Sequence, residues 1–337
     1  MGAHGDAPRP LDDSGAAAVG KICKISYIQR MQVPRPGRTP VILVACAHDE
    51  DPARVVETAA TARRLSASLE RHGRVRAHAV WFHPDDLDDF WACVASEEPA
   101  LTVVLPRVNP TLRENALARR QEPGGPVIVS GDDASAVALT AATLINVSHR
   151  RRGTTAARVL LAHPARLPSL NPLLSAAEVG ELTLWNPADA VAFPLKGIAR
   201  EVDVVINLLD RPDDHLAEPY RSEADTNCDV PIVLEPDNVT DPLLVLPGLL
   251  QALAVRARSA PGLAELDRAY QDMCLACALE LVMATPPAQA SLPRPGPELT
   301  ARLAIAAIGS ATRQARPSHR GPGSNGAAGP DATADGR

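Results

Sequence analysis

The sequence predicts a two-domain protein of the α/β class that is built on parallel sheets. Its 337 residues are enough for two ordinary domains. The balance of 45% hydrophobic and 22% charged residues is typical of a globular chain. Short β-rich runs alternate with helix-length segments along most of the sequence. That alternation is the pattern of parallel strands joined by crossover helices.

The first half of the chain shows this alternation before one long apolar segment. The expected strands are Val41–Cys46, Ala79–Phe82, Thr102–Leu105 and Val127–Ser130. The expected helices are Asp51–His72, Asp85–Ser96 and Pro110–Gln121. The apolar segment Ala134–Ser148 then predicts a buried helix, because basic residues and Gly153 follow it, as is typical of a helix C-terminus.

The second half predicts a doubly wound parallel sheet. Its expected strands are Ala157–Ala162, Leu182–Trp185, Val202–Leu208 and Pro231–Leu234. An amphipathic helix is expected over Leu263–Met283. Cys274 and Cys277 form a C-x-x-C inside that helix, whereas redox pairs usually lie at a strand-to-helix turn, so we interpret them as core thiols rather than as a redox or zinc site.

Charge and hydropathy exclude several classes of partner. A net charge of -6 and a pI near 5.9 favour neither nucleic acid nor an anionic membrane surface. No apolar run reaches the roughly 20 residues of a membrane span, and the first residues have no signal-peptide core. We therefore expect a cytoplasmic protein. Residues 1–20 and 313–337 are poor in large apolar residues and are expected to be disordered tails.

One distinctive segment is Leu246-Pro-Gly-Leu-Leu-Gln-Ala-Leu-Ala-Val-Arg-Ala-Arg258. It resembles the Phe-Pro-Gly-Ile…Ala-Leu-x-Val-Arg-Ala mark of malic enzymes, the family that oxidises and decarboxylates malate with NAD or NADP, and other marks follow in that family's order. Pro126-Val-Ile-Val-Ser-Gly-Asp-Asp-Ala-Ser-Ala-Val137 resembles its Asp-Asp mark. Further marks are Asp203–Ile206, Pro231–Leu234 and Pro293–Ser310.

The resemblance runs from about Ala77 to Thr312 and implies the fold and the domains. It implies a Rossmann-type domain with a doubly wound parallel sheet over residues 134–312. A shortened α/β domain similar to the malic enzyme N-terminal domain is expected before it, over residues 21–133.

The resemblance also implies a Mg²⁺ or Mn²⁺ site, but the residues at its positions have changed. Pro106 and Arg107 stand where the family has a Glu-Asp pair of ligands, and neither can replace a carboxylate. The third ligand falls at Gly131 without a gap, or at Asp132 or Asp133 with a shift of one or two residues. Two aspartates before a helix also have a simpler interpretation, as its N-terminal cap.

The family's catalytic lysine and tyrosine also lack counterparts. The lysine would fall near Leu65, where Arg64 is the nearest basic residue, and an arginine is a poor general base. Tyr27 is a weak substitute for the tyrosine acid, and packing explains it better.

The dinucleotide fingerprint has lost its glycines. In the ungapped register its positions hold His163, Ala165 and Pro168, and Arg166 lies among them as a possible phosphate contact. Asn186 falls at the acidic ribose position. Asn207 and Asn238 fall near later cofactor and substrate positions.

These changes lead to two main hypotheses. The first is a malic-enzyme-like pseudoenzyme without a cofactor, which has a binding or regulatory role and binds itself, another protein such as an active homologue, or a metabolite. The second is a divergent NAD(P)-dependent oxidoreductase that uses Mg²⁺ or Mn²⁺ to decarboxylate malate or a related 2-hydroxy acid. New chemistry around His48, Asp49, Glu50 and Asp51 is a third option, although an acidic helix cap explains that cluster more simply.

Overall fold

The fold was analysed in a computed structural model of the whole chain. The structure describes residues 41–47, 60–67, 76–82, 87–96, 102–105, 110–120, 127–150, 153–209, 231–236, 241–256 and 263–314.

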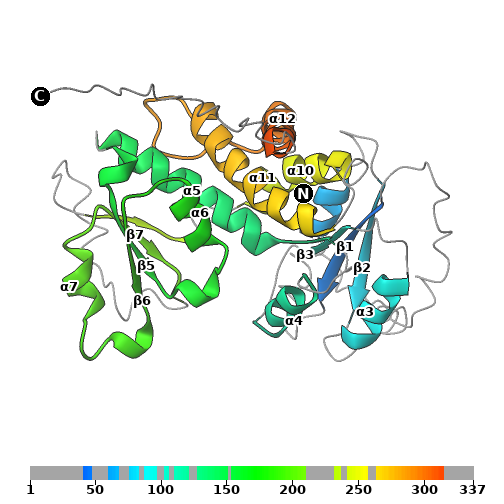
Figure 1. Cartoon of the computed structure of the whole chain (residues 1–337), viewed down its shortest axis with the longest axis horizontal. Coiled ribbons are helices and arrows are strands. Elements are labelled where there is room, and N and C mark those ends of the chain that lie inside the picture. The colour runs from blue at the N-terminus through cyan, green and yellow to red at the C-terminus, as the bar shows by residue number, and fades with distance from the viewer. Residues whose placement is uncertain are drawn as a thin grey trace, which may run out of the picture.

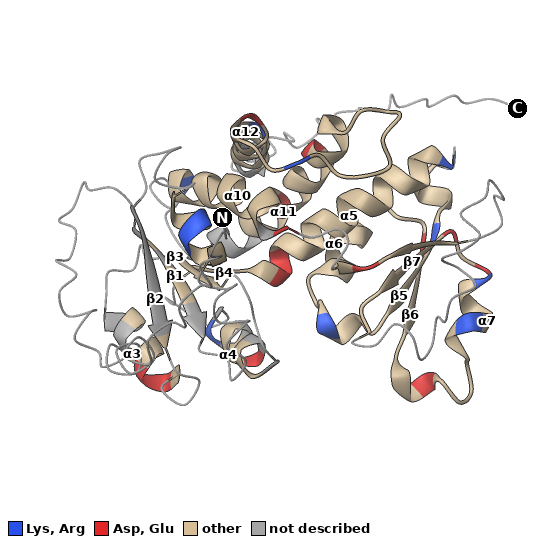
Figure 2. Ribbon diagram, turned by 180° about the vertical axis from the view of Figure 1, so that it is seen from behind, with Lys and Arg blue, Asp and Glu red and all other residues tan. Residues whose placement is uncertain are grey.

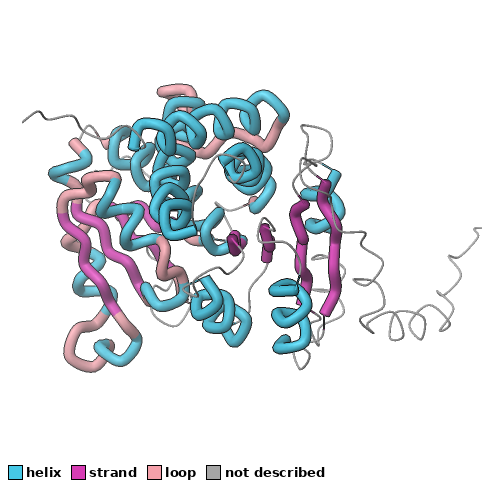
Figure 3. Tube along the Cα trace, turned by 45° about the vertical axis from the view of Figure 1, so that its right-hand side comes forward, coloured by secondary structure: helices cyan, strands magenta, loops and turns pink. Residues whose placement is uncertain are grey.

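Two parallel sheets lie at opposite ends of the molecule, with helices between and above them (Figures 1 and 3). The strand order is β2-β1-β3-β4 in the first sheet and β6-β5-β7-β8 in the second. Every described strand pair is parallel. Parallel pairing requires crossover connections, and this confirms the expected α/β class with a doubly wound sheet.

The first sheet consists of β1 (Val41–Ala47), β2 (Arg76–Phe82), β3 (Thr102–Leu105) and β4 (Val127–Ser130). Its described helices are residues 60–67, α3 (Leu87–Ser96) and α4 (Pro110–Arg120). One face of this sheet packs with α3 and α4 in a core of its own, where the rings of Phe82 and Phe90 stack at 4.5 Å. Because successive side chains of a strand point to opposite faces, Val44, Val104 and Val129 lie on the other face of the sheet and belong to the core at the centre of the molecule.

The second sheet consists of β5 (Arg158–Ala162), β6 (Glu181–Trp185), β7 (Val204–Asn207) and β8 (Ile232–Leu234). Short helices α6 (Leu170–Ala176) and α7 (Leu195–Ala199) connect its strands. Trp185 packs with α7 on the outer face, and its indole N–H donates to the carbonyl of Phe193 at 2.8 Å.

Helix α5 (Gly131–His149) starts directly after β4 and joins the two halves (Figure 1). Nearly all of its residues from Gly131 to Val147 are buried, so it is apolar all round, as expected for a helix enclosed by protein. Its apolar side chains belong to one continuous core that also includes residues from both sheets. The expected helix Ala134–Ser148 is therefore present, and it begins three residues earlier.

Three long helices, α10 (Pro242–Arg256), α11 (Leu263–Ala284) and α12 (Pro297–Gln314), complete this shared core. The Pro-Gly mark lies inside α10, where Gly248 faces α12. A Cβ at Gly248 would lie 2.7 Å from Leu303 Cβ and 3.0 Å from the carbonyl oxygen of Thr300. The glycine thus permits close helix packing, which is a scaffold role.

The boundaries of most elements agree with the sequence prediction within a few residues. The helix expected over Asp51–His72 is described only at residues 60–67. Helix α12 ends at Gln314, two residues into the expected C-terminal tail, and the rest of both tails lies outside the described residues. Among the helices that the structure describes, none has the length and apolarity to cross a bilayer.

Candidate functional site

The acidic first turn of α5 lies between the two sheets, where Figure 2 shows it at the end of β4. Ser130 caps the helix with its hydroxyl, which accepts from the backbone N–H of Asp133 at 3.1 Å. The Asp133 carboxylate completes a capping box, because it accepts from the backbone N–H of Ser130 at 3.0 Å. This geometry supports the cap interpretation of the aspartate pair.

The Asp133 carboxylate also accepts hydrogen bonds from three hydroxyls. Ser130 Oγ lies at 2.9 Å and Tyr270 Oη at 3.0 Å from its Oδ2, and Ser169 Oγ lies 2.9 Å from its Oδ1. Asp133 is only 3% exposed, and Tyr270 is 5% exposed. Residues from β4, α5, α11 and the start of α6 therefore meet at one buried carboxylate, and we call these four side chains the Asp133 cluster.

This donor set does not fit a Mg²⁺ or Mn²⁺ ion. A carboxylate has about four lone-pair positions, and hydrogen-bond donors already take most of that capacity at Asp133. A hard cation needs several oxygen ligands, preferably carboxylates. In the described part of the chain, no group of three or more His, Cys, Asp or Glu residues could hold a metal. Asp132 is half-buried beside Asp133.

Several expected site residues cannot be placed. Pro106, Arg107 and Asn238 lie outside the described residues, as do Tyr27 and the acidic cluster His48–Asp51. At the expected lysine position, Leu65 is fully buried in the shared core. The neighbouring Arg64 is exposed, and its Nε donates to the carbonyl of Ala60 at 3.4 Å. It thus makes a local bond within its own helix.

The loop after β5 occupies the expected fingerprint position. His163 has a left-handed backbone conformation, with φ of 65° and ψ of 58°, although it is not a glycine. The tight turn that the first fingerprint glycine would permit is therefore formed by His163, at some cost in backbone strain. Ala165 and Pro168 are exposed on the same loop, and the helix that follows, α6, has only 7 residues.

Arg166 connects this loop to the neighbouring strand. Its Nη1 donates to the carbonyl oxygen of Leu208, directly after β7, at 3.0 Å. Asn207, the last residue of β7, is 2% exposed, and its Oδ1 accepts from the backbone N–H of Leu209 at 3.2 Å. Asn207 and Arg166 thus both bond to backbone at the carboxyl end of the sheet.

Asn186, at the expected ribose position, is exposed at the end of β6. Its backbone N–H donates to the Asp189 carboxylate at 3.2 Å. Asp189 therefore stabilises a turn beside this position. Because β6, β5 and β7 are adjacent and parallel, their carboxyl ends lie side by side.

These residues do not fit a dinucleotide in the usual pose. The loop keeps the tight turn but has no glycine where the pyrophosphate would approach the backbone. Its serine hydroxyl, Ser169 Oγ, is engaged by Asp133. A seven-residue helix with a proline before its first turn also provides a weak anion site.

The C-x-x-C motif is enclosed in the shared core. Cys274 and Cys277 are both buried in α11, and neither is part of a disulfide. Burial and, secondarily, the nearby Glu280 carboxylate raise the pKa of the Cys277 thiol to about 12. The thiolate needed for redox or metal chemistry is therefore disfavoured at neutral pH.

Comparison with known proteins identifies the fold. No family model matches the sequence, and no curated protein does. Among solved structures, malic enzyme from Pyrococcus horikoshii matches with a TM-score of 0.59 at 15% identity, covering 93% of this chain and 88% of that one. NAD-dependent malic enzyme from Thermotoga maritima matches at 0.58 and 13% identity, covering 91% and 96%. Entamoeba histolytica malic enzyme matches at 0.59 and 12% identity, covering 90% and 74%.

The chain therefore has the malic enzyme fold, and the resemblance inferred from the sequence marks is confirmed at the level of fold. Tyr270 and Ser169 are the important residues that the sequence analysis missed. They lie 137 and 36 residues from Asp133, and no local pattern relates them to it.

Proposed function

We propose that this protein is a malic-enzyme-like pseudoenzyme that acts by binding rather than by oxidising malate. The observation that carries the proposal is the environment of Asp133. Asp133, one of the two aspartates that could serve as a metal ligand, instead caps a helix and accepts hydrogen bonds from three hydroxyls. Replacement of the expected ligand pair by Pro106 and Arg107, together with the lack of a lysine near Leu65, gives further support.

The binding role rests on analogy with a family whose members assemble into oligomers. The proposed partner is a second copy of this chain or another protein, with no nucleic acid or membrane involved and with the protein in the cytoplasm. The proposed domains are residues 21–133 and 134–312. Mass photometry over a range of protein concentrations tests self-association. If the protein is a monomer at all micromolar concentrations, its partner is not a second copy of this chain.

Activity can be tested directly on the full chain. Purified protein supplied with malate, Mn²⁺ and either NAD or NADP should show no formation of NADH or NADPH. A thermal-shift screen with the same compounds should show no stabilisation, because a ligand that binds only the native state raises its apparent stability.

The oxidoreductase alternative predicts the opposite outcome. Mn²⁺-dependent turnover that Asp132→Ala or Asp133→Asn abolishes, in variants that remain folded by circular dichroism, would refute the pseudoenzyme proposal. It would also identify the replacement ligand. Turnover that both variants retain would refute the proposal too, and would place the metal outside the first turn of α5.

A further inference from the structure

The strand order of the second sheet defines one crevice where a ligand would be expected. From β5 the chain passes through α6 to β6 on one side, and then through α7 back to β7 on the other side of β5. The strands that follow β5 and β7 in the chain, β6 and β8, therefore lie on opposite sides of this central pair. Outside the carboxyl ends of such a strand pair lies the crevice in which doubly wound sheets bind their ligands.

A side chain spans this crevice from one loop to the other. Arg166 belongs to the loop after β5, and the carbonyl of Leu208 belongs to the loop after β7, 42 residues away. The donor is a guanidinium and the bond, at 3.0 Å, is partly buried. Charged donors form stronger hydrogen bonds than neutral ones.

Both ends of this connection are held in place by other bonds. The backbone N–H of Leu208 donates to the carbonyl of Ala162 at 3.2 Å, which extends the pairing of β5 with β7. At the other end, Arg166 lies in a short 3-10 turn, and its backbone N–H donates to the carbonyl of His163 at 3.1 Å. The left-handed conformation of His163 directs the chain into that turn.

We propose that Arg166 is a strap that keeps this crevice closed to dinucleotides. The bond between Arg166 and Leu208 joins the two loops between which the pyrophosphate of a dinucleotide would have to enter. It also engages the Arg166 guanidinium, the positive group that could otherwise attract that pyrophosphate. This proposal rests on the proposed function, since it gives a physical reason why the malic enzyme fold of this chain does not bind NAD or NADP. It places an intramolecular contact where the family fold holds a cofactor.

The first experiment measures the strap itself by backbone hydrogen exchange on the full chain. Arg166→Ala should increase exchange about fivefold or more in peptides covering 163–169 and 204–209, because the loops lose their connection. Arg302→Ala is the matched control, since Arg302 also donates to a partner but lies on α12. It should leave both peptides unchanged. Unchanged exchange in Arg166→Ala would overturn the strap.

The second experiment uses calorimetry to measure NADH affinity, and so tests whether Arg166 keeps NADH out of the crevice. The triple variant His163→Gly, Ala165→Gly and Pro168→Gly restores the fingerprint glycines while the strap remains. Adding Arg166→Ala to it should tighten NADH binding at least about tenfold. Equal affinity with and without the added change, or no binding by either variant, would show that Arg166 does not close the crevice.

The wild-type protein distinguishes this proposal from the proposed function. Micromolar binding of NADH by wild-type protein that Arg166→Ala weakens would make Arg166 a phosphate ligand and would refute both. Wild-type turnover of malate would refute both the pseudoenzyme and the closure of the crevice, because the reaction needs NAD or NADP, even if faster exchange in Arg166→Ala confirmed the connection between the loops. Absence of turnover with unchanged exchange would refute the strap alone.

Discussion

The two halves of this protein have the same parallel strand order, but their principal strand-to-helix turns differ. After β4, the chain enters a 19-residue helix through a capping box, in which the side chains of Ser130 and Asp133 each accept a hydrogen bond from the other residue's backbone N–H. After β5, it enters a 7-residue helix through a strained turn at His163 and a loop held by Arg166. The first turn has a local capping box as well as distant partners, whereas the printed side-chain bond of the second is made by Arg166 to the distant Leu208.

The two turns also contact each other. Ser169, at the start of α6, donates to Asp133, and Tyr270 from α11 donates to the same carboxylate. Asp133, one of the residues that the sequence analysis weighed as a metal ligand, thus joins the two halves by hydrogen bonds. The first turn has the larger number of stabilising bonds, and the second has the strained backbone.

The largest expected effect is that of Asp133→Ala. It removes a helix cap and leaves buried hydroxyls without their acceptor, so the free energy of unfolding should fall by about 4 kcal/mol. Urea denaturation followed by circular dichroism measures this. Asp132→Ala, one residue away and half-buried, is the control and should cost less than about 1 kcal/mol. Equal losses for the two aspartates would contradict a special role for Asp133.

Tyr270→Phe should have a smaller effect, about 1.5 kcal/mol, because one buried hydrogen bond is lost while the ring packing is kept. Measured in an Asp133→Asn background, the same change should cost less, since the two side chains share one bond. Strict additivity in this double-mutant cycle would argue against a direct interaction between the hydroxyl and the carboxylate.

His163→Gly tests the strain in the second turn. A left-handed conformation costs a non-glycine residue about 1–2 kcal/mol, while glycine adds roughly 0.5–1 kcal/mol of backbone entropy to the unfolded chain. The variant should therefore be more stable than wild type by about 0.7 kcal/mol in denaturant titrations. Glu178→Gly, at the other described non-glycine residue with positive φ, should change stability in the same direction. A loss of stability at His163 would mean that its imidazole contributes more than the strain costs.

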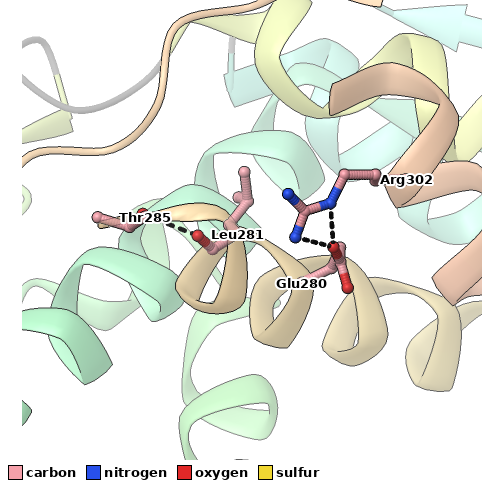
Figure 4. A network of polar contacts seen from close by, with 4 residues as sticks. All are labelled: Glu280, Leu281, Thr285 and Arg302. Carbon is pink, nitrogen blue, oxygen red and sulfur yellow. Dashed lines mark hydrogen bonds and ion pairs between the residues drawn. The ribbon is translucent and has the colours of Figure 1, made fainter. Parts of the chain in front are cut away.

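The smallest expected effect is that of Arg302→Ala on the ion pair between α12 and α11 (Figure 4). The Arg302 guanidinium lies 2.7 Å from Glu280 Oε1, but its side chain is 43% exposed. Water and salt screen such a pair, so its loss should cost about 0.3 kcal/mol and even less in 1 M salt. A loss as large as that of Tyr270→Phe would show that this exposed ion pair contributes as much to stability as a buried hydrogen bond.

Much of the scaffold could be predicted from the sequence. Buried parallel strands are continuous apolar runs, so β3 and β4 could be placed at their observed bounds. The aspartates before the apolar helix α5 indicated a cap because the bonds of a capping box lie within three residues. The order of the malic enzyme marks predicted the fold that the solved structures share.

The roles of the site residues depended on contacts between distant segments. The resemblance placed His163, Ala165 and Pro168 at the positions of the fingerprint glycines, but it did not indicate that His163 would make a left-handed turn. That conformation is imposed by the strands and helix on either side of the loop, because surrounding packing can outweigh a local strain of a few kcal/mol.

The sequence by itself determined which chemical groups are present: the strand and helix pattern, the Asp-Asp pair before the apolar helix, and the residues at the expected fingerprint and lysine positions. Only the tertiary structure decided what those groups bond to. Tyr270 meets Asp133 across 137 residues, and Arg166 meets Leu208 across 42. The physical reason is that periodicity and capping arise from neighbours along the chain, whereas a hydrogen bond between distant segments forms only where packing brings donor and acceptor to about 3 Å.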